Sequence, residues 1–127
     1  MENQTLVKEI SLFNALEYVK NGALFVDVRE KEEVDQLAYD VPNIINIPLS
    51  VFEDHYTEIP KDKEVVMVCK GGGRSLRAAG FLVNHDYANV VNMQNGIVGW
   101  VQSGFPFKGD KSSVISNSCD CSKPGCC

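Results

Sequence analysis

The residues best suited to chemistry lie in the stretch VVMVCKGGGRSLRAA, at positions 65–79. Cys69 ends an apolar run rich in valine and is the first of the five cysteines. Glycines follow at positions 71, 72 and 73. Because glycine lacks a Cβ atom, successive backbone N–H groups of such a loop can converge on one point. A sulfur at that point is stabilised as the thiolate, the nucleophilic form of cysteine. We therefore predict that Cys69 is a catalytic nucleophile.

Two cations strengthen the preference of this loop for anions. Arg74 can hold an oxyanion group through two parallel hydrogen bonds, whereas Lys70 acts as a point charge at the rim. Ser75 is either the N-cap of the following helix or a hydroxyl contact to the substrate anion, and the sequence leaves both open. The predicted substrate-binding residues are Lys70, Gly71, Gly72, Gly73, Arg74 and Ser75.

Other interpretations of this loop are weaker. A nucleotide-binding P-loop requires G-x-x-x-x-G-K-[ST], and GGGRS has neither this span nor the lysine. A dinucleotide-binding loop needs a further glycine at the position of Leu76. A buried, inert cysteine at the end of a strand is the structural alternative, but three successive glycines would weaken an ordinary connection without any gain.

The elements that must position this loop alternate between strands and helices along the chain. Near-continuous apolar runs such as ALFVDV and EVVMVC are typical of strands that are covered on both faces. We predict an α/β fold: a three-layer sandwich with a central, mostly parallel sheet of about five strands and helices on both faces. The expected strands span 5–10, 23–28, 43–48, 64–69 and 89–93, and the expected helices span 11–20, 30–38, 75–86 and 96–104.

Local signals add detail to this scheme. Ser11 is placed to cap the first helix. In the third helix, the periodicity predicts that Leu76, Ala79 and Val83 share one buried face. The segment 51–63 has little periodicity and is expected to be a polar connection.

Composition and charge exclude several classes of function. Of the 127 residues, 44% are hydrophobic and 23% are charged, as expected for a single globular domain. The net charge of -5 argues against a nucleic-acid or anionic-membrane partner, which needs a basic face. No apolar stretch is long enough to span a membrane, and the start MENQTLVKEIS lacks the features of a signal peptide. A cytoplasmic location is therefore expected.

The composition turns polar after Phe107, so we expect a domain over residues 1–108 and a flexible, cysteine-rich tail over residues 109–127. Four cysteines crowd the end of this tail: Cys119, Cys121, Cys126 and Cys127. Their spacing departs from that of structural zinc sites, so the main expectation is that the tail holds no metal ion. Three roles remain open for the tail: binding of a soft metal ion by the four thiolates, acceptance of sulfur from Cys69, or no defined role.

Four stretches, taken in order, resemble the rhodanese-like domain family and in particular its single-domain sulfurtransferases. They are FVDVRE at 25–30, NIINIPL at 43–49, VVMVCKGGGRS at 65–75 and NGIVGWVQSGFP at 95–106. The cysteine loop followed by arginine and serine is the most specific of them. One departure is Asn95, which stands where the family has the first of two glycines. Asparagine tolerates left-handed backbone best after glycine.

The resemblance implies a thiosulfate or persulfide sulfurtransferase that works through a persulfide on Cys69. The implied partners are a small-molecule or protein sulfur donor and a thiol acceptor, with no cofactor, nucleic acid or membrane. Phosphatases of the same fold have one more residue between the cysteine and the arginine, and here only residues 70–73 separate Cys69 from Arg74. A phosphatase or arsenate reductase is therefore the less favoured enzyme.

A non-enzymatic rhodanese-like module is the alternative from a different class of function. Such a module would bind a partner or sense redox state through Cys69. The three glycines and Arg74 favour the enzyme, because a binding module needs neither.

Three residues outside the loop are predicted to support the site. Asp27 and Arg29 end a central strand at the same sheet edge as Cys69, and the favoured interpretation is that they bond local groups rather than substrate. Trp100 is expected to anchor the core. The two histidines, at positions 55 and 85, lie far apart, so we predict no histidine-based metal site.

Overall fold

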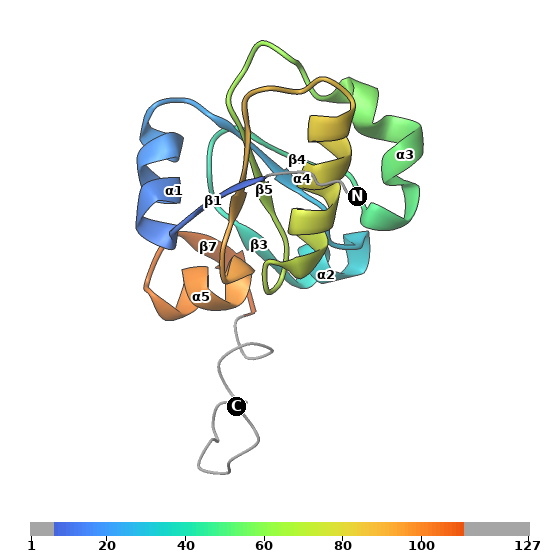
Figure 1. Cartoon of the computed structure of the whole chain (residues 1–127). Helices are drawn as coiled ribbons and strands as arrows, with labels where there is room; N and C mark the ends of the chain where they lie inside the picture. The colour runs from blue at the N-terminus through green and yellow to red at the C-terminus, as the bar shows by residue number, and fades with distance from the viewer. Residues whose placement is uncertain (1–6, 111–127) are drawn as a thin grey trace.

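The computed structural model of the chain describes residues 7–110 (Figure 1). Its centre is a five-stranded sheet with the order β1-β6-β5-β2-β4, in which all neighbouring strands are parallel. These strands are β1 (Lys8–Ile10), β2 (Leu24–Asp27), β4 (Ile44–Asn46), β5 (Val65–Val68) and β6 (Val90–Met93). The predicted α/β fold with a parallel sheet is confirmed.

Helices cover both faces of this sheet, which gives the three layers visible in Figure 1. The helices are α1 (Leu12–Lys20), α2 (Lys31–Gln36), α3 (Phe52–His55), α4 (Gly73–Asn84) and α5 (Gly96–Gln102). Helices α1 and α5 cover the face on which Trp100 packs against Phe25, and α3 and α4 cover the face on which Leu82 packs. None of the helices within residues 7–110 combines the length and the hydrophobicity of a membrane span.

The sequence pattern located the central elements well. Every residue of β2 and β5 is buried, as their continuous apolar runs indicated. Ser11 is the N-cap of α1, and its hydroxyl oxygen accepts the backbone N–H of Asn14 at 3.1 Å. This bond satisfies one of the N–H groups that the first turn of a helix leaves free.

A second, two-stranded antiparallel sheet was not predicted. It pairs β3 (Leu37–Tyr39) with β7 (Phe107–Gly109). The helix expected over 30–38 ends at Gln36, and the extended backbone of Leu37 begins the strand instead. The partner strand lies at the far end of the domain, so nothing in the local periodicity indicates the pairing.

The segment expected as a polar connection, 51–63, is partly helical. Two 3-10 turns flank α3: η1 (Leu49–Val51) precedes it and η2 (Tyr56–Glu58) follows it. The buried ring of Phe52 packs against Phe81 of α4. Elements of three or four residues are too short to show a period, and tertiary packing stabilises them.

Helix α4 begins at Gly73, ahead of the predicted start at Ser75, and buries a different face. The buried residues are Ser75, Ala78, Ala79 and Leu82. Leu76 is 39% exposed and Val83 is only half-buried, so the predicted face was correct at Ala79 alone. Small residues at the buried positions allow the helix to lie close to the sheet, whereas a pattern weighted by large apolar residues selects a rotated face.

Candidate active site

Cys69 directly follows β5, at the edge of the sheet where the parallel strands end. The residue is 1% exposed, and two backbone N–H groups donate to its sulfur: that of Gly72 at 3.1 Å and that of Ser75 at 3.3 Å. Gly72 is the N-cap of α4 and Ser75 lies in its first turn, so the positive end of the helix dipole faces the same sulfur. Both effects favour a negative charge on the sulfur.

The glycines give this loop its shape. Gly72 has a φ of 105°, in the left-handed region that favours glycine, and a Cβ atom there would lie 3.2 Å from the backbone nitrogen of Asn95. At Gly71 and Gly73, in contrast, a Cβ atom would meet nothing within 4 Å. The loop is therefore held tightly at Gly72, whereas the Cβ directions of Gly71 and Gly73 face open space.

The carbonyl side of the loop is bound by α5 and by a buried tyrosine. The N–H of Ile97 donates to the carbonyl of Cys69 at 2.9 Å, and the N–H of Val98 donates to that of Lys70 at 3.2 Å. The hydroxyl of Tyr39 also donates to the carbonyl of Cys69, at 2.8 Å. Burial raises the pKa of Tyr39 well above its usual range, so this hydroxyl keeps the proton that it donates. The loop thus presents N–H groups to the sulfur and directs these carbonyls away from it.

The start of α5 makes this close packing possible. Asn95 and Gly96 both have left-handed backbone, with φ of 72° and 55°. Asn95, which stands where the family has a glycine, thus adopts the left-handed backbone that asparagine tolerates best after glycine. At Gly96 a Cβ atom would lie 2.1 Å from the carbonyl oxygen of Lys70, so only glycine permits this approach.

Arg74 follows the glycines, and its guanidinium faces Glu33 of α2. Its two terminal nitrogens donate to the two carboxylate oxygens of Glu33, at 2.8 and 3.0 Å. Hydrogen bonding to Arg74 lowers the pKa of Glu33 from 4.5 to about 2, and the same bonding raises the pKa of Arg74. Both side chains remain one third exposed. The guanidinium of Arg74 is therefore paired with Glu33 and still partly open to solvent.

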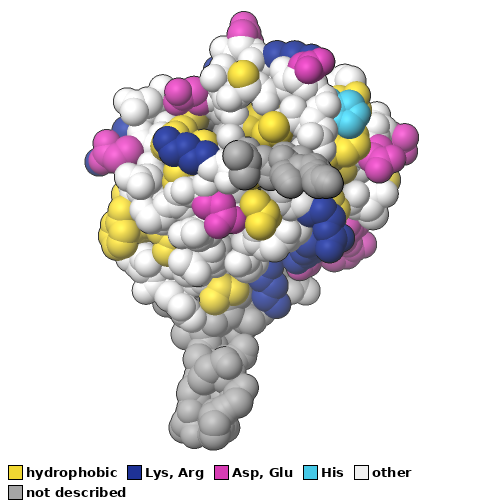
Figure 2. Space-filling model, in the orientation of Figure 1, with side chains coloured by type: hydrophobic (Ala, Val, Ile, Leu, Met, Phe, Trp, Pro, Cys, Tyr) yellow, Lys and Arg dark blue, Asp and Glu magenta, His cyan; other side chains and the backbone are white. Residues whose placement is uncertain are grey.

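Cations gather where α4 begins. On the face drawn in Figure 2, a group of Lys and Arg side chains lies beside the end of α4 that carries the loop. Lys70 and Arg77 are exposed at this end, and Arg74 is partly exposed. Lys70 and Arg77 thus add exposed positive charge at this end of the helix, in a chain with a net charge of -5.

Asp27 and Arg29 pair with each other. The guanidinium donates to both carboxylate oxygens at 2.8 to 3.1 Å, and the two side chains are almost completely buried. The guanidinium also lies 5.6 Å from the ring centre of Tyr39, whose hydroxyl bonds Cys69. Arg29 is thus occupied by local groups, and the pair lies against Tyr39, which bonds the carbonyl of Cys69.

Trp100 lies in the core beside Tyr39. The side chain is fully buried, and its indole N–H donates to the carbonyl of Pro106. Its ring packs edge-on against the rings of Phe25, Tyr39 and Phe105. Trp100 thus packs against Tyr39, whose hydroxyl bonds the Cys69 carbonyl.

Three residues that contact the site are absent from the predicted set: Glu33, Tyr39 and Asn92. Glu33 belongs to a run of several acidic residues, and the sequence does not indicate which of them pairs with an arginine. Tyr39 directly follows the segment 30–38 that was predicted as a helix, and it lies in no predicted element. Asn92 offered a usable signal, because a polar residue inside an apolar strand requires buried hydrogen-bond partners.

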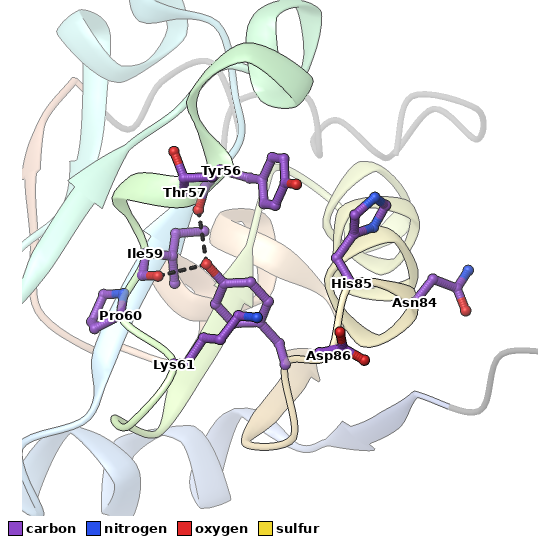
Figure 3. Close-up of a pocket in the computed structure, with 9 residues that line it drawn as sticks. Tyr56, Thr57, Ile59, Pro60, Lys61, Asn84, His85 and Asp86 are labelled. Atoms are coloured by element: carbon purple, nitrogen blue, oxygen red, sulfur yellow. Dashed lines mark hydrogen bonds between the residues drawn. The ribbon is translucent and has the colours of Figure 1, made fainter.

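Within residues 7–110, no group of three or more His, Cys, Asp or Glu side chains is arranged to hold a metal ion. A pocket of about 560 Å³ is lined in part by Tyr56, Lys61 and His85, whose side chains are drawn in Figure 3. This pocket lies at the far end of α4, so the length of that helix, roughly 18 Å, separates it from the loop. The four cysteines of the predicted tail, Cys119, Cys121, Cys126 and Cys127, lie outside the described residues.

These observations define a class of protein. It has an α/β fold with a parallel sheet, and an inner strand of that sheet leads to a cysteine in a glycine-rich loop at a helix N-terminus. The model of the Rhodanese-like domain matches residues 13–103, and the chain belongs to this family.

Individual relatives agree with this assignment. The chain is 35% identical to a sulfurtransferase of Allochromatium vinosum over 83 residues, which cover 65% of this chain and 76% of that protein. It is 29% identical to the putative sulfurtransferase YtwF of Bacillus subtilis over 96 residues, which cover 74% of this chain and 90% of the relative. A rhodanese-related protein from Thermoplasma volcanium has a similar structure, with a TM-score of 0.71 and 29% identity over 81% of this chain and 99% of that one. Family and relatives together support a role in sulfur transfer.

Proposed function

We propose that this chain is a sulfurtransferase that carries a sulfane sulfur on Cys69 as a persulfide. The observation that carries the proposal is the pair of N–H groups, from Gly72 and Ser75, that point at the Cys69 sulfur from a glycine-rich loop. Such donors stabilise a sulfur anion in the resting thiolate and at the outer sulfur of a persulfide. The names of the sulfurtransferase relatives give further support.

Sulfur transfer proceeds in two balanced steps. The thiolate of Cys69 attacks the outer sulfur of thiosulfate, or of a persulfide donor, and forms a new S–S bond. With thiosulfate, the original S–S bond breaks and sulfite leaves with the electron pair. An acceptor thiolate then attacks the outer sulfur of the Cys69 persulfide, and Cys69 leaves as a thiolate. One sulfur atom has moved, and neither step requires an outside oxidant.

The loop residues have distinct proposed roles. The N–H groups of residues 70–75 hold the sulfur anion and the departing sulfite, and Lys70 attracts the anionic donor. Ser75 contributes its N–H, because its hydroxyl is bonded to Asn92 in the core. Arg74 meets the donor at the open side of the loop, next to Glu33.

The proposal is tested by the mass of the intact chain after incubation with thiosulfate. We expect a species about 32 Da heavier, which disappears when cyanide removes the sulfur. Peptide mapping should locate the added sulfur on Cys69, and the same analysis shows whether any of the four tail cysteines receives it.

Cys69→Ser is the matched variant, because it changes one atom and leaves the loop glycines in place. We expect it to keep the fold, judged by circular dichroism, and to lose thiosulfate:cyanide sulfur transfer. Retained activity in this variant contradicts the mechanism. If the unaltered chain gains no sulfur but Cys69 oxidises reversibly, the redox-sensing module is the better interpretation.

The free thiol that this chemistry needs also bears on location. Cys69 is the one cysteine in the described part of the chain, and it forms no disulfide. A reducing compartment keeps such a thiol available, so we place the protein in the cytoplasm.

A further inference from the structure

One side chain holds both residues that donate to the Cys69 sulfur. Asn92 lies in β6 and is 1% exposed. Its Oδ1 accepts the hydroxyl of Ser75 at 2.5 Å, and its Nδ2 donates to the carbonyl of Gly72 at 3.2 Å. Gly72 and Ser75 point their N–H groups at the sulfur and use other atoms, the carbonyl and the hydroxyl, to bond Asn92. Asn92 thus bridges the two residues that donate to the sulfur.

The orientation of this amide is determined by its surroundings. Nδ2 faces two acceptors, the carbonyl of Gly72 and a carboxylate oxygen of Glu9 at 3.3 Å, and Oδ1 faces a hydroxyl donor. Glu9 lies opposite Asn92 in the β1–β6 pairing and also accepts from the side chain of Gln94. Rotating the amide by half a turn would place its oxygen against both acceptors. Asn92 is thus fixed to the sheet and can in turn fix the loop.

We propose that Asn92 is the positioning residue of the Cys69 site. By anchoring Gly72 and Ser75 to the central sheet, it aims their N–H groups at the sulfur and sustains the thiolate. A hydrogen bond weakens steeply as its angle departs from linearity, so the direction of each N–H matters. Glycine has wide backbone freedom, so the bond from Asn92 to the Gly72 carbonyl restrains the direction of the Gly72 N–H. Only the expected effect on persulfide formation rests on the proposed function; the effect on the ionisation of Cys69 does not.

Asn92→Ala tests this role through the ionisation of Cys69. With ¹³C at the cysteine Cβ, the chemical shift of Cys69 follows its thiol–thiolate equilibrium against pH in the absence of any sulfur donor. The spectrum of Cys69→Ser identifies the signal among those of the five cysteines. We expect the midpoint to move upward and the ratio of thiolate to thiol, at a fixed pH below the midpoint, to fall about tenfold. Persulfide formation from thiosulfate should slow in proportion at that pH and recover above the new midpoint.

Two further variants complete the test. Ser75→Ala keeps the N–H of residue 75 and removes one of the two anchors, so we expect a smaller upward move; it also serves where Asn92→Ala does not fold. Asn46→Ala is the matched control, because that amide donates to the carbonyls of Asp27 and Arg29 from β4, at the same edge of the sheet. It should lose stability and leave the midpoint of Cys69 unchanged.

None of these variants alters a charge, so a moved midpoint reports the direction of the N–H groups. The charged or titratable groups around the sulfur and Asn92 are Glu9, Asp27, Arg29, Glu33, Tyr39, Lys70, Arg74 and Arg77. All of them remain in each variant.

The outcomes separate the two proposals. An unchanged midpoint in Asn92→Ala, or in Ser75→Ala where the first variant does not fold, overturns the positioning role. An equal move in Asn46→Ala assigns the effect to general loosening and overturns it as well. If the midpoint moves as expected but thiosulfate leaves no sulfur on Cys69 in the unaltered chain, the proposed function fails and the positioning role stands.

Discussion

The contact between α5 and the cysteine loop can be tested with a single methyl group. A Cβ atom at Gly96 would lie 2.1 Å from the carbonyl oxygen of Lys70 and 2.6 Å from the backbone nitrogen of Gly71. Both are backbone atoms, which cannot rotate aside as the end of a side chain can. We therefore expect Gly96→Ala to push the loop away from α5 and to disturb the surroundings of Cys69.

Two contributions set the size of the effect. The left-handed backbone at Gly96 costs alanine about 1–2 kcal/mol. Displacing the loop also breaks the bonds from Ile97 and Val98 to the loop carbonyls, at about 1 kcal/mol each. The expected loss is about 3–4 kcal/mol. Gly22→Ala is the matched control, because Gly22 has a φ of 86° with nothing within 4 Å of a Cβ atom, and it should cost only the backbone contribution.

Urea unfolding of the parent and the two variants measures these free energies, and the rate of persulfide formation measures the effect on Cys69. Gly96→Ala should be the less stable variant and should form the persulfide more slowly, whereas Gly22→Ala should match the parent rate. Equal losses of stability in the two variants, with the parent rate in both, would refute the argument that α5 holds the loop in place.

Two more predictions concern the partners of the loop. Tyr39→Phe should lower the unfolding free energy by only about 1 kcal/mol in urea, because Ile97 still donates to the carbonyl of Cys69; a loss several times larger would contradict this. The pKa of Glu33 is lowered from 4.5 to about 2 by Arg74, so the stabilisation from this pair is fully present above about pH 4.5 and is lost as the pH falls toward 2. Because one third of each side chain is exposed, solvent limits the contribution to about 1 kcal/mol. Glu33→Gln should lose that amount at pH 7 and match the parent near pH 2 in the same assay, and a difference that persists at pH 2 would exclude the ion pair as its cause.

Much of the framework could be predicted from the sequence because its signals are local. Continuous apolar runs indicated the buried strands β2 and β5, and Ser11 indicated the start of α1. The cysteine loop could be interpreted in the same way, since the conformational freedom of glycine is a property of each residue alone. The direction in which α4 turns its buried face was predicted less well, because small residues such as Ser75 and Ala78 carry a weak hydrophobic signal.

The sequence by itself thus determined the class of fold and the position of Cys69 in a glycine-rich loop ahead of a helix. The tertiary structure alone decided which groups hold that loop in place. Glu33 meets Arg74, Tyr39 meets the carbonyl of Cys69, and Asn92 meets Gly72, each across a long separation in the chain. Local patterns record the preferences of neighbouring residues, whereas these contacts depend on where the folded sheet brings distant strands and helices together.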